Sequence, residues 1–126
     1  MSTLQSSVPA IVVCTRDRPR STAFYRDTLG LVLAHEDRFA AVFSFAGVTL
    51  RVSHVPDFVA HAHTILGFTV PDVAATVTAL AARGVTFNRY PAFSQDARGI
   101  LALPGDKHVA WFSDPDGNVL SVTDVR

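Results

Sequence analysis

One pattern occurs twice along the chain and constrains its fold more than any other feature. Each copy has a short apolar run, an aspartate, a helix-like stretch and a glycine, followed by β-branched and aromatic residues. In the first copy Asp17 is a suitable N-cap for a helix predicted over 18–29, and Gly30 ends it. In the second copy Asp72 and Gly84 bound apolar residues at helical spacing. The repeat predicts two related halves.

Strand-like segments follow each predicted helix. They cover 39–45 and 47–53 in the first half, and 107–113 and 118–124 in the second. Val85 and Phe87 are expected to restart a strand directly after the second helix. Each half is therefore predicted to have the element order βαβββ. We expect a single α+β domain over 1–126, with module one at about 9–54, a linker at about 55–62 and module two at about 63–125.

Charge and composition exclude several classes of function. The 11 basic and 11 acidic residues balance and form no block, so neither nucleic acid nor an anionic membrane is an expected partner. No apolar run is long enough to span a bilayer. The single Cys14 excludes an internal disulfide, and the first ten residues lack a secretory signal. We expect a soluble, cytoplasmic protein.

Two motifs carry a family resemblance. They are TAFYRDTLGL at 22–31 and WFSDPDGNVL at 111–120. Together they resemble the vicinal oxygen chelate superfamily, which includes glyoxalase I, extradiol dioxygenases and bleomycin resistance proteins, and the similarity covers 9–125. The resemblance implies two βαβββ modules in a curved, half-open mixed sheet, with helices outside, a concave face for a ligand and a homodimer. We interpret Asp114 to Asn118 as a turn that defines the fold rather than as catalytic.

The resemblance also identifies four positions where metal-dependent members carry ligands. Here they fall on Ala10, Arg51, Ile65 and Ser121. Two have no donor atom, one is a cation, and neutral serine is a poor ligand. A slip of two residues would bring His63 in place of Ile65, which still leaves one histidine. We therefore expect no cofactor, and a divalent metal is the alternative.

Alternation along the strands predicts which side chains share the ligand face. These are Val12, Cys14, Thr49, Arg51, Ser53, Gly67, Thr69, Val109, Trp111 and Ser121. The candidate ligand-binding residues are Arg51, Trp111, Tyr90, Ser121 and Thr69. Arg51 suits a carboxylate, phosphate or enolate, and its alternative role is a structural ion pair or a place at the rim. Trp111 and Tyr90 suit a planar ligand, and core packing is their alternative.

The long loop predicted over 91–106 contains Gln95, Asp96 and Arg98, which either act over a cleft mouth or are merely solvated. The first function hypothesis is a small-molecule-binding protein that sequesters an amphipathic or acidic ligand. The alternative is a metal-dependent lyase, isomerase or dioxygenase of the same superfamily. A metal-free catalyst that uses Arg51 as an electrophile is a third hypothesis, for which the sequence identifies no base.

Overall fold

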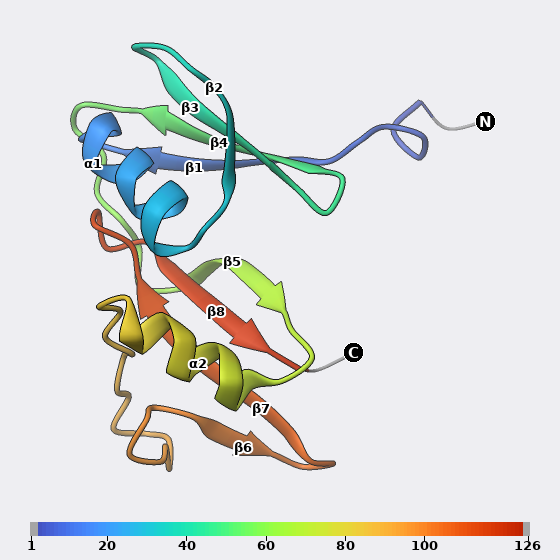
Figure 1. Ribbon diagram of the computed structural model, residues 1–126, viewed down its shortest axis with the longest axis vertical. Helices are drawn as coiled ribbons and strands as arrows, with labels where there is room; N and C mark the ends of the chain where they lie inside the picture. The colour runs from blue at the N-terminus through green and yellow to red at the C-terminus, as the bar shows by residue number, and fades with distance from the viewer. Residues whose placement is uncertain (1–2, 125–126) are drawn as a thin grey trace. The chain divides into compact units, whose positions relative to one another are not determined.

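Two βαβββ units follow one another along the chain in a computed structural model, which describes residues 3–124 (Figure 1). The first unit ends at Phe58 and the second begins at Val59. Each unit has a mixed, four-stranded sheet that is not closed, and one helical segment. The α+β fold class with two βαβββ modules is thereby confirmed. Position 125, where we predict module two to end, lies outside the described residues.

The first unit has a sheet with the strand order β1-β4-β3-β2. Strand β1 is parallel to β4, and the other neighbours are antiparallel. The strands are β1 (Ala10–Thr15), β2 (Val32–Glu36), β3 (Ala40–Phe45) and β4 (Val48–His54). The predicted segments 39–45 and 47–53 therefore match β3 and β4 within one residue.

The helix of this unit changes its geometry halfway. Helix α1 (Arg18–Ala23) begins where the Asp17 carboxylate accepts a hydrogen bond from the Arg20 N–H at 3.2 Å. It continues as the π-helix η1 (Phe24–Thr28), in which the Leu29 N–H donates to the Phe24 carbonyl. Within η1, Tyr25 is fully buried and its ring centroid lies 6.0 Å from that of Phe43. The sequence predicts the extent of this segment but not its wider turn.

The second unit has the strand order β5-β8-β7-β6, again with its first strand parallel to its last. Its strands are β5 (Thr64–Thr69), β6 (Leu101–Leu103), β7 (Lys107–Ser113) and β8 (Val119–Thr123). Helix α2 (Val73–Ala82) is capped by Asp72, whose carboxylate accepts the Ala75 N–H at 3.0 Å. Beneath α2 lies an apolar core made of Leu66, Val73, Val77, Leu80, Ala110, Phe112, Leu120 and Val122.

The prediction that a strand restarts at Val85 and Phe87 is wrong. Phe87 forms only an isolated bridge with Phe112, and β6 comes from within the segment that was predicted to be an irregular loop. Two features end the pairing soon after Phe87. The Tyr90 N–H donates to the Gln95 side chain instead of to a strand, and Pro91 has no N–H to donate.

No helix among residues 3–124 is long and apolar enough to cross a membrane.

Candidate functional site

Three aromatic rings form a cluster on one face of the second sheet. Trp111 comes from β7, and Tyr90 and Phe93 come from the segment between α2 and β6. The Phe93 and Trp111 rings are stacked, with centroids 5.4 Å apart at 17°, and Tyr90 meets Trp111 edge-on at 5.3 Å. Phe93 is 46% exposed, and Trp111 and Tyr90 are half-buried. The cluster, defined by these three residues, thus offers an aromatic surface that is not sealed in the core.

The sheet beside the cluster has small side chains. Gly67, Ser121 and Trp111 are direct cross-strand partners on β5, β8 and β7. A Cβ atom on Gly67 would lie 3.1 Å from the Ser121 Oγ, so there is little room for a larger residue. Thr69 is two residues along β5 and exposed, whereas Ser121 is buried. Trp111, Ser121 and Thr69 therefore share this face, and Tyr90 lies beside it because its ring contacts that of Trp111.

The segment that holds Tyr90 and Phe93 is ordered by the Gln95 side chain. Its Oε1 accepts the Tyr90 N–H at 2.7 Å, and its Nε2 donates to the carbonyls of Asn88 and Gly99 at 2.8 and 2.9 Å. The Asp96 carboxylate accepts the N–H groups of Arg98 and Ile100, and it pairs with the Arg98 guanidinium at 3.3 Å. These contacts of Gln95, Asp96 and Arg98 all lie within their own loop.

Arg51 belongs to the first unit, on a face that is free of α1. It lies in a row of cross-strand partners that runs from Val12 through Arg51 and Val42 to His35. Arg51 is exposed, and Val12 beside it is 58% exposed. Among residues 3–124 the Arg51 side chain makes no ion pair or hydrogen bond. Its guanidinium therefore has its donors available for an acidic group.

The residues at the four positions that the resemblance predicts as ligand positions do not suit a metal. In the first unit, Ala10 has no donor and Arg51 carries a positive charge on the neighbouring strand β4. In the second unit, Ile65 lies at an irregularity of β5, and the buried Ser121 offers one neutral hydroxyl. No group of three His, Cys, Asp or Glu side chains suited to a metal is found in the described part of the chain.

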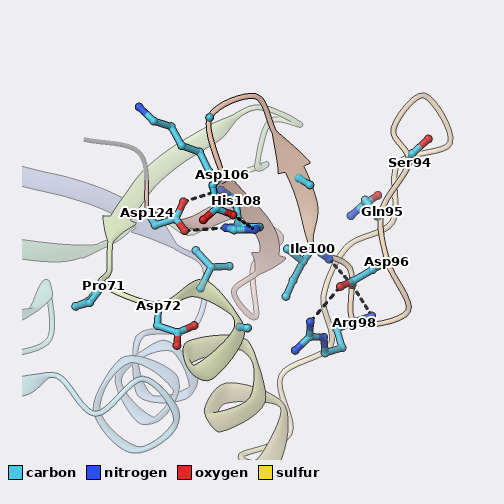
Figure 2. A pocket seen from close by; sticks show the side chains of 15 residues that line it. Pro71, Asp72, Ser94, Gln95, Asp96, Arg98, Ile100, Asp106, His108 and Asp124 are labelled. Atoms are coloured by element: carbon cyan, nitrogen blue, oxygen red, sulfur yellow. Dashed lines mark hydrogen bonds and ion pairs between the residues drawn. The ribbon is translucent and has the colours of Figure 1, made fainter.

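The second unit also has a hollow of about 840 Å³ at the amino-terminal end of α2 (Figure 2). Its walls come from the start of α2, the segment between α2 and β6, β6 itself, the β6–β7 turn, the start of β7 and the residue after β8. The polar lining residues are Asp72, Ser94, Gln95, Asp96, Arg98, Asp106, Lys107, His108 and Asp124. Pro71, Val73, Ala74, Ile100, Ala102 and Gly105 complete the lining. We call this the α2 hollow.

A histidine–carboxylate pair lies in the α2 hollow. The Asp124 carboxylate accepts the His108 backbone N–H at 2.6 Å and lies 2.8 Å from the His108 Nδ1 (Figure 2). The hydrogen bond to Asp124 raises the pKa of His108, and the same bond lowers the pKa of Asp124. This pair was not identified from the sequence. The register of β7 against β8, which pairs Val109 with Thr123, is the signal that brings the two together.

A smaller hollow of about 300 Å³ in the first unit is lined by Asp17, Pro19, His54 and three arginines. Of the arginines, Arg18 forms an ion pair with Glu36, and the Arg38 guanidinium lies 4.7 Å from the centroid of the Phe39 ring. Two of its cations are thus already engaged with neighbouring side chains of the same unit.

Comparison with known proteins links the fold to one family. The model of the Glyoxalase/Bleomycin resistance protein/Dioxygenase superfamily matches residues 7–122. A lactoylglutathione lyase from Agrobacterium tumefaciens has a similar structure, with 17% identity, a TM-score of 0.71 and coverage of 94% of this chain and 92% of that one. No curated protein matches the chain significantly.

Two further solved structures agree with this assignment of the fold. A glyoxalase/bleomycin resistance protein from Catenulispora acidiphila is 21% identical, with a TM-score of 0.70 over 95% of this chain and 100% of that one. A glyoxalase/bleomycin resistance protein/dioxygenase from Alicyclobacillus acidocaldarius is 20% identical, with a TM-score of 0.69 over 97% and 93%. At these identities the likeness shows the fold alone.

Proposed function

Because the chain belongs to the Glyoxalase/Bleomycin resistance protein/Dioxygenase superfamily, we propose that it binds and sequesters a small amphipathic or acidic molecule without a metal. The observation that carries this proposal is the aromatic cluster of Tyr90, Phe93 and Trp111. Phe93 leaves nearly half of its surface exposed on a face that the helix does not cover. Large apolar side chains left open to water in this way favour an apolar partner.

The cluster suits a flat or extended apolar group. A ligand placed on the stacked rings of Phe93 and Trp111 would remove apolar area from water, which contributes about 25 cal/mol per Å². The Tyr90 hydroxyl already receives a hydrogen bond from the Asn88 side-chain amide at 3.2 Å, so its ring is held in place before a ligand arrives. Such preorganisation reduces the entropy lost on binding.

Binding at the cluster can be measured through the only tryptophan of the chain, Trp111. In a ¹H–¹⁵N spectrum its indole N–H gives a single cross-peak, which we expect to shift in a saturable way with phenylbutyrate or decanoate. Phe93→Ala should weaken phenylbutyrate binding by about tenfold, the effect of losing roughly 1.4 kcal/mol of contact. Val59→Ala is the control, because Val59 is 72% exposed in the same unit and outside the cluster. An indole peak that is unmoved by every amphipathic acid would refute the proposal.

Arg51 is the residue to which we assign the recognition of an acidic group. Its exposed guanidinium makes no ion pair among the described residues, so an arriving carboxylate would not have to displace one. Arg51→Ala should weaken the binding of a small carboxylate such as acetate to the first unit by about tenfold or more, since hydrogen bonds to charged groups contribute about 1.5–3 kcal/mol. The melting temperature should stay near that of the wild type. Unchanged binding together with a large loss of stability would assign Arg51 a structural role.

We also propose that the protein works as a cytoplasmic homodimer. The first unit exposes Val12, Val32 and Phe39 by 58%, 69% and 59%, and exposed apolar side chains of this size favour association. Sedimentation equilibrium should give the mass of two chains. A mass of one chain at every concentration would contradict the dimer. This result would leave the ligand-binding proposal unaffected.

A further inference from the structure

The α2 hollow is built from a different face of the second sheet than the aromatic cluster. Its lining residue His108 is on β7, where it alternates with the face that carries Trp111, and Ala102 on β6 is the cross-strand partner of His108. We propose that the α2 hollow is a second binding site, whose ligand is a small organic cation: an amine or guanidinium carried on a short apolar group.

The charges around the α2 hollow favour a positive ligand. Four carboxylates line it, from Asp72, Asp96, Asp106 and Asp124, against the cations of Arg98 and Lys107. The ion pair between Arg98 and Asp96 neutralises one charge of each sign (Figure 2). The negative charges that remain are those of Asp72, Asp106 and Asp124, and the remaining positive groups are Lys107 and the titratable His108. A partly enclosed cation near them is attracted more strongly than it would be in bulk water.

The charged residues lie around an apolar wall. In Figure 2 the Ile100 side chain lies between the His108–Asp124 pair and the Asp96–Arg98 pair. Ile100 is buried, and Val73 from the first turn of α2 is buried too. A ligand with an apolar group next to its charge would meet both kinds of surface, as is usual in small-molecule sites. The volume of about 840 Å³ is ample for such a ligand.

The same carboxylates do not suit a metal ion. A metal needs several ligand atoms gathered around one point, and the described residues contain no such group of three His, Cys, Asp or Glu side chains. Of the carboxylates, Asp124 is engaged by His108, and Asp72 accepts a hydrogen bond from the helix N-terminus. Negative charge spread along a wall in this way matches a larger organic cation.

Two substitutions remove charge from the α2 hollow and keep its backbone, and the one at Asp106 also removes its ion pair with His108, whose Nε2 lies 3.8 Å from the Asp106 carboxylate. Asp106 has a φ of 58° and a side chain that is 99% exposed, and asparagine tolerates this left-handed conformation well. Asp72 caps α2, and asparagine is an equally good N-cap. The double variant D72N/D106N therefore loses two charges without losing the turn or the cap. Asp57→Asn, which removes one charge from an exposed residue that does not line the hollow, is the control for a loss of negative charge elsewhere on the surface.

The test is an NMR titration with benzylamine and with benzyl alcohol, its neutral counterpart of similar shape. We expect benzylamine to shift the amide peaks of Val73, Ile100 and His108, and benzyl alcohol to bind at least several-fold more weakly. D72N/D106N should weaken benzylamine binding by about tenfold, roughly threefold for each carboxylate, and D57N should leave it unchanged. Melting curves confirm that each variant is folded.

Three results would overturn the proposal. The first is the absence of saturable shifts around the α2 hollow with benzylamine. The second is equal binding of benzylamine and benzyl alcohol, which would remove the role of charge. The third is a shift confined to the Trp111 indole peak, which would place the amine at the aromatic cluster instead. None of these results bears on whether the cluster binds amphipathic acids.

Discussion

The hydrogen bond between His108 and Asp124 joins two groups whose charges depend on pH. The bond raises the pKa of His108 above its ordinary 6.5, so the histidine's contribution to stability is complete below pH 6.5 and is lost as the pH rises through the raised value. The pKa of Asp124 is lowered from its ordinary 3.8, so its contribution is complete above pH 3.8 and is lost as the pH falls through the lowered value. The pair therefore stabilises the fold most between pH 3.8 and pH 6.5.

We predict that Asp124→Asn lowers the melting temperature more in mild acid than in mild base. Relative to the wild type, the loss should be larger at about pH 5.5, where His108 is charged, than at about pH 8.5, where it is neutral. Asparagine retains an oxygen for the backbone N–H of His108, so the difference between the two pH values isolates the charge. Asp57→Asn is the control and should show no such difference. Equal losses at both pH values would show that the charged form of the pair adds nothing.

Individual residues of the site differ in how far the sequence could reveal them. Strand alternation predicts that Trp111, Ser121 and Thr69 share one face of the second sheet, and the register agrees. The role of these residues and of Arg51 in binding stays a prediction. The sequence did not predict the stacking of Phe93 on Trp111 or the hydrogen bonds of Gln95, because an irregular loop has no periodic pattern that places its side chains. The bonds that Gln95 makes to Asn88, Tyr90 and Gly99 depend on the loop's own path. No local pattern indicates them.

Among the elements, the β7–β8 turn depends on one buried carboxylate. Asp114 is 5% exposed and accepts the N–H groups of Asp116 and Asn118 at 2.9 and 3.0 Å, and the Asn118 side-chain amide at 2.8 Å. These bonds fix the turn that pairs β7 with β8, to which Trp111 and Ser121 belong. The interpretation of this motif as one that shapes the fold agrees with these contacts.

We predict that Asp114→Ala destabilises the protein by about 2–4 kcal/mol, because it leaves buried donors without partners. Asp114→Asn should cost less, since it keeps the oxygen that receives both backbone N–H groups, although it loses the bond from the Asn118 amide. Urea denaturation of the two variants and the wild type gives the order. A loss below about 0.5 kcal/mol for the alanine variant would mean that the turn forms without this carboxylate.

Element boundaries follow from the sequence where a cap or a turn marks them. Asp17 and Asp72 each mark the start of a helix within one residue, because a side-chain acceptor is needed at that point. The second strand of the second unit was misplaced, because Val85 and Phe87 have the β-branched and aromatic character of a strand. No strand forms there because the chain leaves the sheet at Tyr90 and Pro91. The Tyr90 N–H donates to the Gln95 side chain, and this contact forms only in the folded chain.

At the scale of the whole molecule, each of the two units keeps the βαβββ framework of the family and has residues poorly suited to a metal at the predicted ligand positions. The caps, the left-handed Gly30 and the Asp114 turn are in place. The first unit has Ala10 and Arg51 at the ligand positions, and the second has Ile65 and Ser121. We expect framework and ligand positions to be separable, because the framework depends on caps, turns and backbone geometry and not on the side chains at the four predicted ligand positions.

This separation predicts how the protein responds to divalent ions. Protein purified without a chelating tag should contain far less than one metal ion per chain, and nickel, zinc or iron should leave its melting temperature unchanged. A ligand that binds only the native state raises the melting temperature, and the rise grows with the ratio of the ligand concentration to its Kd. Phenylbutyrate is therefore the positive control in the same assay and should raise it. Stoichiometric bound metal, together with stabilisation by one of these ions, would contradict the metal-free proposal and favour the metal-dependent lyase, isomerase or dioxygenase. It would mean that Ser121 and its neighbours bind a cation that their chemistry disfavours.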